Sequence, residues 1–300
     1  MIFINPKTDY AFKKIFGSSE SKEILISFLN ALIYEGNPTI QDLEIINPNL
    51  PPKLEGLKDS YLDVKAKLSD GTLVIIEMQV LNVQSFGKRV LYNAAKTYAF
   101  QLEAAQGYRL LKPVIALTIT DFEMFPNNSP EFISRFVFKE VKKNFTYPEN
   151  NLDLVFVELP KFTKGQEELE TLADKWVYFM KNARSLTSVP ETMDSIPEIH
   201  EAFNIANQAS LSREEVEDLD RREQFIYDQQ GAILKAVQEG IEQGIEQGIE
   251  QGIEQGREEG MREKAIAIAR QLLSQLDNAT IAQVTGLSVE DVQNLRSGDS

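Results

Sequence analysis

The sequence contains no cysteine and a single histidine among its 300 residues. The lack of cysteine excludes disulfides, zinc–thiolate sites, iron–sulfur clusters and cysteine nucleophiles. It also fits a reducing compartment, and we expect a cytoplasmic protein. The histidine, His200, lies in an acidic segment with a helical pattern. We therefore expect it to be a surface residue rather than a catalytic base.

Long apolar runs are missing as well. No stretch approaches the roughly 20 apolar residues of a membrane span, and the N-terminal segment, charged from Lys7 onward, has no apolar signal-peptide region. We expect neither export nor a membrane anchor. No glycine-rich phosphate loop follows a predicted strand, and no nucleophile-elbow motif is present. The sequence therefore gives no support for an enzyme with a glycine-rich phosphate loop or for a hydrolase with a nucleophile elbow.

Hydrophobic residues make up 42% and charged residues 26% of the chain, which is ordinary globular usage and excludes wholesale disorder. The net charge of −15 is unevenly distributed, because residues 1–164 contain 19 basic and 19 acidic residues whereas 165–300 contain 12 and 27. The neutral N-terminal part has a basic cluster of Arg135, Lys139, Lys142 and Lys143. Two interpretations remain open for this cluster: contact with a phosphate backbone, or lysines that protect a strand edge.

Runs of β-branched and aromatic residues predict six strands, at 43–47, 61–68, 73–80, 113–120, 132–141 and 152–159. Apolar residues at helical spacing predict two helices within 9–34 and a long crossover helix over 85–105. This order predicts an α/β fold with a mixed sheet. We expect an α/β domain over 1–164, a helical extension over 165–211, a long charged helix over 212–276 and a helix-turn-helix-like hairpin over 277–300.

The long charged helix contains a repeat, in which the sequence GIEQ occurs four times from Gly240 to Gln255 and is followed by Gly256. Each repeat advances about 400° on a helix, so the isoleucines form a spiralling stripe rather than a straight seam. Five interior glycines cost about 4 to 5 kcal/mol of helix propensity. The repeat is either a self-association segment that uses the glycines for close approach or a semi-flexible linker.

The last segment places Ala282, Gly286 and Val292 at the offsets of a helix-turn-helix. Its second helix exposes Glu290 and Asp291, which would repel DNA. We therefore favour a capping helical hairpin over a sequence-reading module.

The segment from residue 58 to residue 79 is the most informative part of the chain. Ser69-Asp70-Gly71 suits a three-residue hairpin loop that pairs Leu68 with Thr72. In this register Asp63 lies opposite Glu77 on one face. The other face is apolar and consists of Leu62, Val64 and Ala66 opposite Met78, Ile76 and Val74. A two-residue turn would place the two carboxylates on opposite faces instead.

Like charges opposite each other are destabilising unless a cation joins them, so this register requires a metal or a compensating lysine, for which Lys65 is the candidate. Asp63, Glu77 and the Gln79 amide supply the hard oxygen atoms that hold Mg²⁺. Such an ion polarises a phosphodiester and activates water. On spacing alone, the alternative is a pair of solvent-facing carboxylates on an ordinary hairpin.

Several motifs together resemble one known family. They are DYAFKKIFG at 9–17, KDSYLDV at 58–64, Asp70-Gly71, IEMQ at 76–79 and FGKRVLY at 86–92. These motifs are similar to those of the Rpn family of recombination-promoting nucleases, also described as PD-(D/E)XK nuclease family transposases. The resemblance extends over nearly the whole chain, because members also tend to end in a charged, glycine-spaced helix and a small helical hairpin.

The resemblance implies a restriction-endonuclease-like core, a mixed sheet flanked by helices that cuts DNA with Mg²⁺ or another divalent cation. It makes Asp63 the metal-binding aspartate and Glu77 the second metal-binding carboxylate, and it gives Asp9 the acidic position of the first helix. Gln79 stands where the superfamily has a lysine and cannot carry that positive charge. Lys65 is the candidate substitute. Arg89 and Tyr92 either orient phosphate or buttress the site.

The leading hypothesis is a Mg²⁺-dependent DNA endonuclease that forms a homo-oligomer through its C-terminal helices and promotes recombination or DNA mobility. The alternative is a nuclease-derived DNA- or protein-binding assembly protein that no longer cuts and acts through its helical C-terminal region. Gln79 and the acidic C-terminal half favour the alternative, whereas Asp63 and Glu77 favour the enzyme. A DNA-binding regulator that uses the terminal hairpin is disfavoured by Glu290 and Asp291.

Overall fold

The computed structural model describes residues 2–50, 60–103, 105–125 and 130–298. The chain divides into two compact units, Met1–Gln229 and Gln230–Ser300. No helix in these described ranges is both long enough and apolar enough to cross a membrane.

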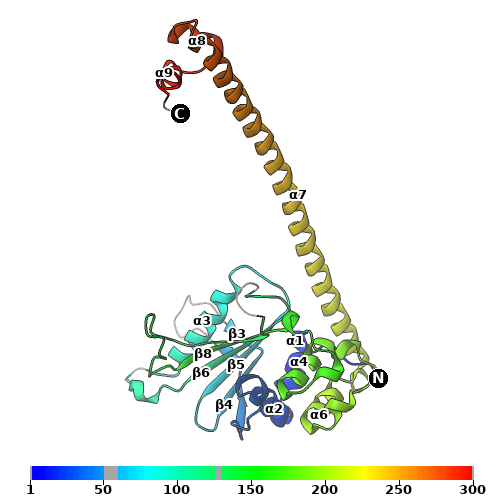
Figure 1. The fold of residues 1–300 in the computed structure, drawn as a ribbon. Helices are drawn as coiled ribbons and strands as arrows, with labels where there is room; N and C mark the ends of the chain where they lie inside the picture. The colour runs from blue at the N-terminus through cyan, green and yellow to red at the C-terminus, as the bar shows by residue number, and fades with distance from the viewer. Residues whose placement is uncertain (1, 51–59, 104, 126–129, 299–300) are drawn as a thin grey trace. The chain divides into compact units, whose positions relative to one another are not determined.

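A six-stranded mixed sheet forms the centre of the first unit (Figure 1). In spatial order its strands are β1 (Leu43–Ile46), β4 (Val64–Leu68), β5 (Leu73–Gln79), β6 (Val114–Thr120), β8 (Leu152–Glu158) and β7 (Ile133–Phe136). β5, β6 and β8 are parallel, and the other neighbours are antiparallel. β2 (Asn49–Leu50) and β3 (Ser60–Tyr61) form a separate small ladder. The mixed sheet predicted from the sequence is thereby confirmed.

Helices cover both faces of the sheet. On one face, α1 (Asp9–Phe16), α2 (Lys22–Ile33), α4 (Leu172–Asn182), α5 (Glu191–Asp194) and α6 (Pro197–Ala206) share a core with Val64, Val74 and Ile76. The other face carries α3 (Phe86–Ala99), the predicted crossover helix, which packs on Ile75 and Phe156. Short 3₁₀ turns occupy Ser19–Ser21, Tyr108–Leu110, Leu159–Lys161, Gln166–Glu168, Ala183–Ser185 and Gln208–Ser210. α4, α5 and α6, which follow residue 164, are thus part of the same core as the strands.

The β4–β5 hairpin has the predicted loop and register. Gly71 adopts a φ of 89°, which suits glycine, and the Leu68 amide donates to the Thr72 carbonyl at 2.8 Å. The ladder pairs Val64 with Ile76. The prediction that Leu62 lies on the same face as Val64 is wrong, because residues 62 and 63 interrupt the strand between β3 and β4. The break reverses the alternation, and Leu62 packs in the cluster beneath α3.

The all-α part begins with α7 (Arg213–Leu272), whose first turns belong to the first unit. In the second unit, α8 (Asn278–Thr285) and α9 (Val289–Ser297) pack with the end of α7 through Ala269, Ile281 and Val292. Gly286, with a φ of 75°, ends α8. The predicted long helix and helical hairpin are confirmed.

Candidate active site

Asp63 and Glu77 lie next to each other at the open end of the β4–β5 hairpin. The Asp63 amide donates to the Ile76 carbonyl at 3.2 Å, and Asp63 Oδ2 accepts from the Met78 amide at 2.7 Å. Asp63 is therefore bonded to the residues on both sides of Glu77. The regular ladder ends one residue earlier, at the Val64–Ile76 pair. Asp63, in the break between β3 and β4, is thus next to Glu77 on β5. The prediction that the two carboxylates share one face is wrong, because the break directs Asp63 toward α1 whereas Glu77 contacts α3 on the other face.

The Asp63 carboxylate meets α1. Lys13 Nζ lies 3.7 Å from Asp63 Oδ1 and 2.6 Å from Asp9 Oδ1, and the two carboxyl groups are close enough to shift each other's pKa. Burial raises the pKa of Asp63 to about 7, and Asp9 adds to this rise while the Met78 amide and Lys13 oppose it. Burial alone would raise the pKa of Asp9 too, but its bonds to Lys13 and Asp63 lower it. Ionising both carboxyl groups together is costly, and a cation would offset that cost.

The Glu77 carboxylate meets α3 instead. Asn93 Nδ2 donates to Glu77 Oε1 at 2.6 Å, and Arg89 Nε lies 3.7 Å from Glu77 Oε2. Burial raises the pKa of Glu77, against the effects of Asn93 and Arg89. The other polar atom of that amide, Asn93 Oδ1, is buried and has no hydrogen-bond partner among the described residues. This side of the site therefore has an oxygen that an added donor or ion would satisfy.

Gln79 is held at both ends of its amide. Its Oε1 accepts from Arg89 Nη2 at 2.5 Å, and its Nε2 donates to the Leu81 carbonyl at 2.7 Å. Arg89 thus contacts both Glu77 and Gln79, and its guanidinium stacks 4.9 Å from the Phe86 ring centroid. The guanidinium brings positive charge to the position at which the superfamily has a lysine.

The structure does not bring every candidate to the carboxylates. Lys65 is half-buried on β4, where burial lowers its pKa, and it forms no ion pair with Asp63 or Glu77. Tyr92 is exposed, and its ring lies 5.8 Å from Lys96 Nζ, further along α3. Lys58 and Asp59 of the motif lie outside the described residues.

Sequence reasoning missed Lys13 and Asn93. Lys13 follows Asp9 by four residues, and Asn93 follows Arg89 by four, so each pair shares one face of a helix. This i,i+4 spacing was the available signal. Neither spacing reveals which strand the helix faces, and so the contacts with Asp63 and Glu77 could not be derived from it.

The side chains of Asp63 and Glu77 are of the chemical type that a divalent cation prefers. Asp63 and Glu77 offer carboxylate oxygens, which Mg²⁺ prefers, and Mg²⁺ in proteins is commonly held by one or two carboxylates with several waters. In the described ranges no group of three or more histidine or acidic side chains is arranged around one point. Asp63 and Glu77 are therefore the candidate ligands, and water and substrate oxygens would have to complete the shell.

Comparison with known protein families gives two matches. Residues 6–236 match the family described as PD-(D/E)XK nuclease family transposase. Residues 262–297 match the C-terminal HTH domain of the Rpn/YhgA-like nuclease family. No curated protein and no solved structure matches the chain. The first match covers well over half of the chain and confirms the resemblance seen in the motifs, so the chain belongs to the PD-(D/E)XK nuclease family transposases.

Proposed function

We propose that this protein is a metal-dependent DNA endonuclease that hydrolyses phosphodiester bonds and serves recombination or DNA mobility. The observation that carries the proposal is the pair of neighbouring, largely buried carboxylates, Asp63 just before β4 and Glu77 on β5. Buried carboxylates are costly unless they serve a purpose such as holding a cation. Membership of a nuclease family supplies the independent support.

Asp63 and Glu77 would hold the divalent cation. When bound, such an ion lowers the pKa of a water ligand and polarises the scissile phosphodiester. Asn93 orients Glu77 by its hydrogen bond to Oε1, and Arg89 fixes Gln79. Lys13, whose ammonium lies beside Asp63, is our candidate for stabilising negative charge that develops on the phosphate, in place of Lys65.

A catalytically weak, nuclease-derived assembly protein is the second candidate. It is favoured by Gln79, whose amide is fully used in bonds to Arg89 and Leu81 and thus serves as a structural element. The acidic second half of the chain also favours it, because that half repels DNA.

The helical C-terminal region is the proposed site of homo-oligomer formation. Ile241, Ile245, Ile249 and Ile253 are 57% to 67% exposed. DNA contact by the terminal hairpin gains little support from its charges: Glu290 is exposed, and Arg296 donates to the Leu276 carbonyl and Asn278. We therefore place the DNA surface on the first unit.

Cleavage of supercoiled plasmid by the full chain, with Mg²⁺ or with EDTA, tests the proposal. Asp63→Asn and Glu77→Gln keep the side-chain shape and remove the charge, and we expect each to slow cleavage by about 100-fold or more. Lys13→Gln should slow it by about 10- to 100-fold, because one electrostatic stabiliser is lost.

The matched controls are Asp42→Asn, which removes an exposed carboxylate that pairs with Lys22, and Lys14→Gln, which removes a neighbouring lysine that pairs with Glu215. Both should cleave at nearly the wild-type rate. Thermal melts should show all variants folded. Equal rates for wild type, Asp63→Asn and Glu77→Gln would refute the site, and a wild type that is inactive with several divalent metals would favour the assembly protein.

A further inference from the structure

The chain between β7 and β8 forms a small hairpin that exposes aromatic side chains. Lys139 and Thr146 pair in a bridge, the Glu140 amide donates to the Phe145 carbonyl at 2.9 Å, and the Tyr147 amide donates to the Phe138 carbonyl at 2.8 Å. The exposed apolar side chains are Phe136, Phe138, Val141, Phe145 and Tyr147, each 45% to 96% accessible. An apolar cluster of this kind on a protein surface is typical of a binding site.

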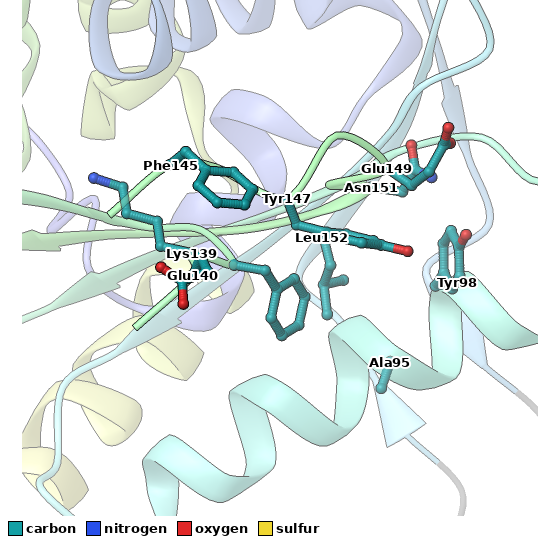
Figure 2. Close-up of a pocket in the computed structure, with 10 residues that line it drawn as sticks. Ala95, Tyr98, Lys139, Glu140, Phe145, Tyr147, Glu149, Asn151 and Leu152 are labelled. Carbon is teal, nitrogen blue, oxygen red and sulfur yellow. The ribbon is translucent and has the colours of Figure 1, made fainter. Parts of the chain in front are cut away.

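This hairpin and the second half of α3 enclose a hollow of about 680 Å³. Figure 2 shows Ala95 and Tyr98 of α3 on one side of it and the rings of Phe145 and Tyr147 on the other, above Leu152. The volume lies within the range of about 300 to 1,000 Å³ that ligand sites have. The hollow is thus large enough for flat groups to enter between aromatic walls.

The exposure of these rings is not a result of a loose loop. Asn150 Oδ1 accepts from the Phe138 amide at 3.0 Å, and Asn150 Nδ2 donates to Asp153 Oδ1 at 2.5 Å. Asp153 Oδ2 in turn accepts from Arg135 Nε at 3.0 Å. These bonds fix the base of the hairpin to β7 and β8. The rings are therefore presented on an ordered backbone, which lowers the entropy cost of binding.

The hairpin carries three lysines, and two glutamates, Glu140 and Glu149, also line the hollow. Lys139, Lys142 and Lys143 are exposed, and within the described ranges none of them forms an ion pair. Glu140, the nearest acidic residue, accepts from the backbone amides of Lys142 and Lys143. In Figure 2 the Lys139 ammonium extends past Phe145 at one end of the hollow, and Glu149 lies at the other. Aromatic rings beside lysines suit a ligand with flat faces and repeated negative charges, as in single-stranded nucleic acid.

The hollow lies on the same face of the sheet as Glu77, at the other end of α3. Leu152 of the hollow is level with Val114 and Leu73 in the parallel ladder, four residues before Glu77 on β5. Four residues of a strand span about 13 Å, and the two strand spacings from β8 to β5 add about 10 Å across the sheet, so the separation is about 16 Å. This distance equals roughly five nucleotides at about 3.4 Å each. A strand bound in the hollow could therefore continue to the carboxylates.

We propose that the hollow between the β7–β8 hairpin and α3 binds unpaired bases of single-stranded DNA, a few nucleotides from the bond that is cut. The bases stack on Phe145 and Tyr147, and the lysines of the hairpin contact the phosphates. This inference rests on the proposed function only in taking DNA as the polymer that is bound. It adds the substrate class: DNA with an unpaired segment rather than continuous duplex.

Equilibrium binding of the full chain in EDTA tests this inference without any contribution from cleavage. The probes are a fluorescent single strand of about 12 nucleotides, an abasic strand of the same length, and a blunt duplex of the same sequence. We expect Phe145→Ala/Tyr147→Ala to weaken single-strand binding by about 10-fold or more, since each stacked base contributes about that factor. Binding to the abasic strand and the duplex should change by less than about 3-fold. Tyr108→Ala, which removes an 86% exposed ring outside the hollow, is the control and should change nothing.

Lys142→Gln/Lys143→Gln provides the second readout. The slope of log affinity against log salt for the single strand should become shallower by about 1.4, because two phosphate contacts are lost. An equal loss of affinity on the abasic strand, or no preference of wild type for bases over the abasic strand, would overturn the proposal. So would a concentration-dependent dimer that Phe145→Ala/Tyr147→Ala abolishes, because the rings would then face a second copy. Failure of the cleavage test would leave all these binding results interpretable.

Discussion

Residues 213–229 and residues 240–256 belong to the same helix, α7, but their surroundings differ. In the first segment Leu219 is 4% exposed in the core of the first unit, and Glu215 accepts from Tyr10 and Lys14. In the second segment the four isoleucines are 57% to 67% exposed, and a Cβ atom added to any of the glycines would meet nothing within 4 Å. The first segment is stabilised by its own chain, whereas the isoleucines of the second are left exposed.

This difference separates two properties along one helix. Changes in residues 213–229 should alter the stability of the first unit, and changes in the repeat should alter self-association. The first segment also reaches the candidate site, since Arg222 Nη1 lies 3.9 Å from Asp9 Oδ2. The start of α7 is therefore linked to the candidate site, and the proposed self-association is assigned to the repeat.

Replacement of all four repeat isoleucines by glutamine should have the largest effect. Burial of one isoleucine side chain contributes about 1.5 to 3 kcal/mol, so four of them contribute up to about 6 to 12 kcal/mol to an oligomer. We expect the dissociation constant to rise by about 100-fold or more, measured by sedimentation equilibrium of the full chain.

Gly244→Ala/Gly248→Ala distinguishes the two interpretations of the repeat. If the glycines allow close helix approach, the added methyl groups weaken association. If the repeat is a linker, each alanine instead stabilises the helix by about 0.8 to 1 kcal/mol, and association does not change. A monomeric mass for the wild type at micromolar concentration would show that the repeat does not drive assembly.

The sequence predicts turns, strands and helices of this chain better than it predicts contacts between elements that are far apart in sequence. Ser69-Asp70-Gly71 determines the hairpin, because its glycine supplies the positive φ that a three-residue loop requires. The strand predicted over 132–141 ends at Phe136, because residues 138–147 pair with each other in a hairpin rather than with β8. Leu62 was placed on the wrong face, since hydrophobic alternation does not reveal a break in a strand.

In the candidate site, too, contacts between residues far apart in sequence could not be predicted. Asp63 and Glu77 were predicted to be neighbours because a hairpin connects them in sequence. Lys13 is fifty residues from Asp63, and its contact depends on how α1 packs against the sheet. Amphipathic spacing predicts that a helix has a buried face, but not which strand it meets. The docking of Leu219 in the core was missed for the same reason.

Leu219→Ala and Leu234→Ala make the same substitution in the two parts of α7. Leu219 is buried, so its truncation should lower the free energy of unfolding by about 2 to 5 kcal/mol. Leu234 is 69% exposed, and its truncation should change the free energy of unfolding by less than about 0.5 kcal/mol. Urea denaturation measures both values, and the slope of unfolding free energy against urea concentration should be the same for both variants and the wild type. Equal losses of stability for the two variants would mean that Leu219 contributes no more to folding than an exposed leucine, and that the start of α7 does not pack in the core of the first unit.

Glu215→Gln should have the smallest effect, and one that depends on pH. Bonds from Tyr10, from the Ser212 amide and from Lys14 lower the pKa of Glu215 to about 2, from an ordinary value of 4.5. A carboxylate whose pKa is lower in the folded state stabilises that state above its unfolded pKa, and this stabilisation is lost as pH falls toward the folded value. Wild type should therefore be more stable than Glu215→Gln at pH 7, and the difference should shrink between about pH 4.5 and pH 2.

Glu217→Gln removes only an exposed pair with Arg213 on the same helix and should show no such trend. Urea denaturation of the three proteins at pH 7 and near pH 3 makes the comparison. If the difference between wild type and Glu215→Gln is as large near pH 3 as at pH 7, the contact of Glu215 with α1 does not stabilise the docked start of α7.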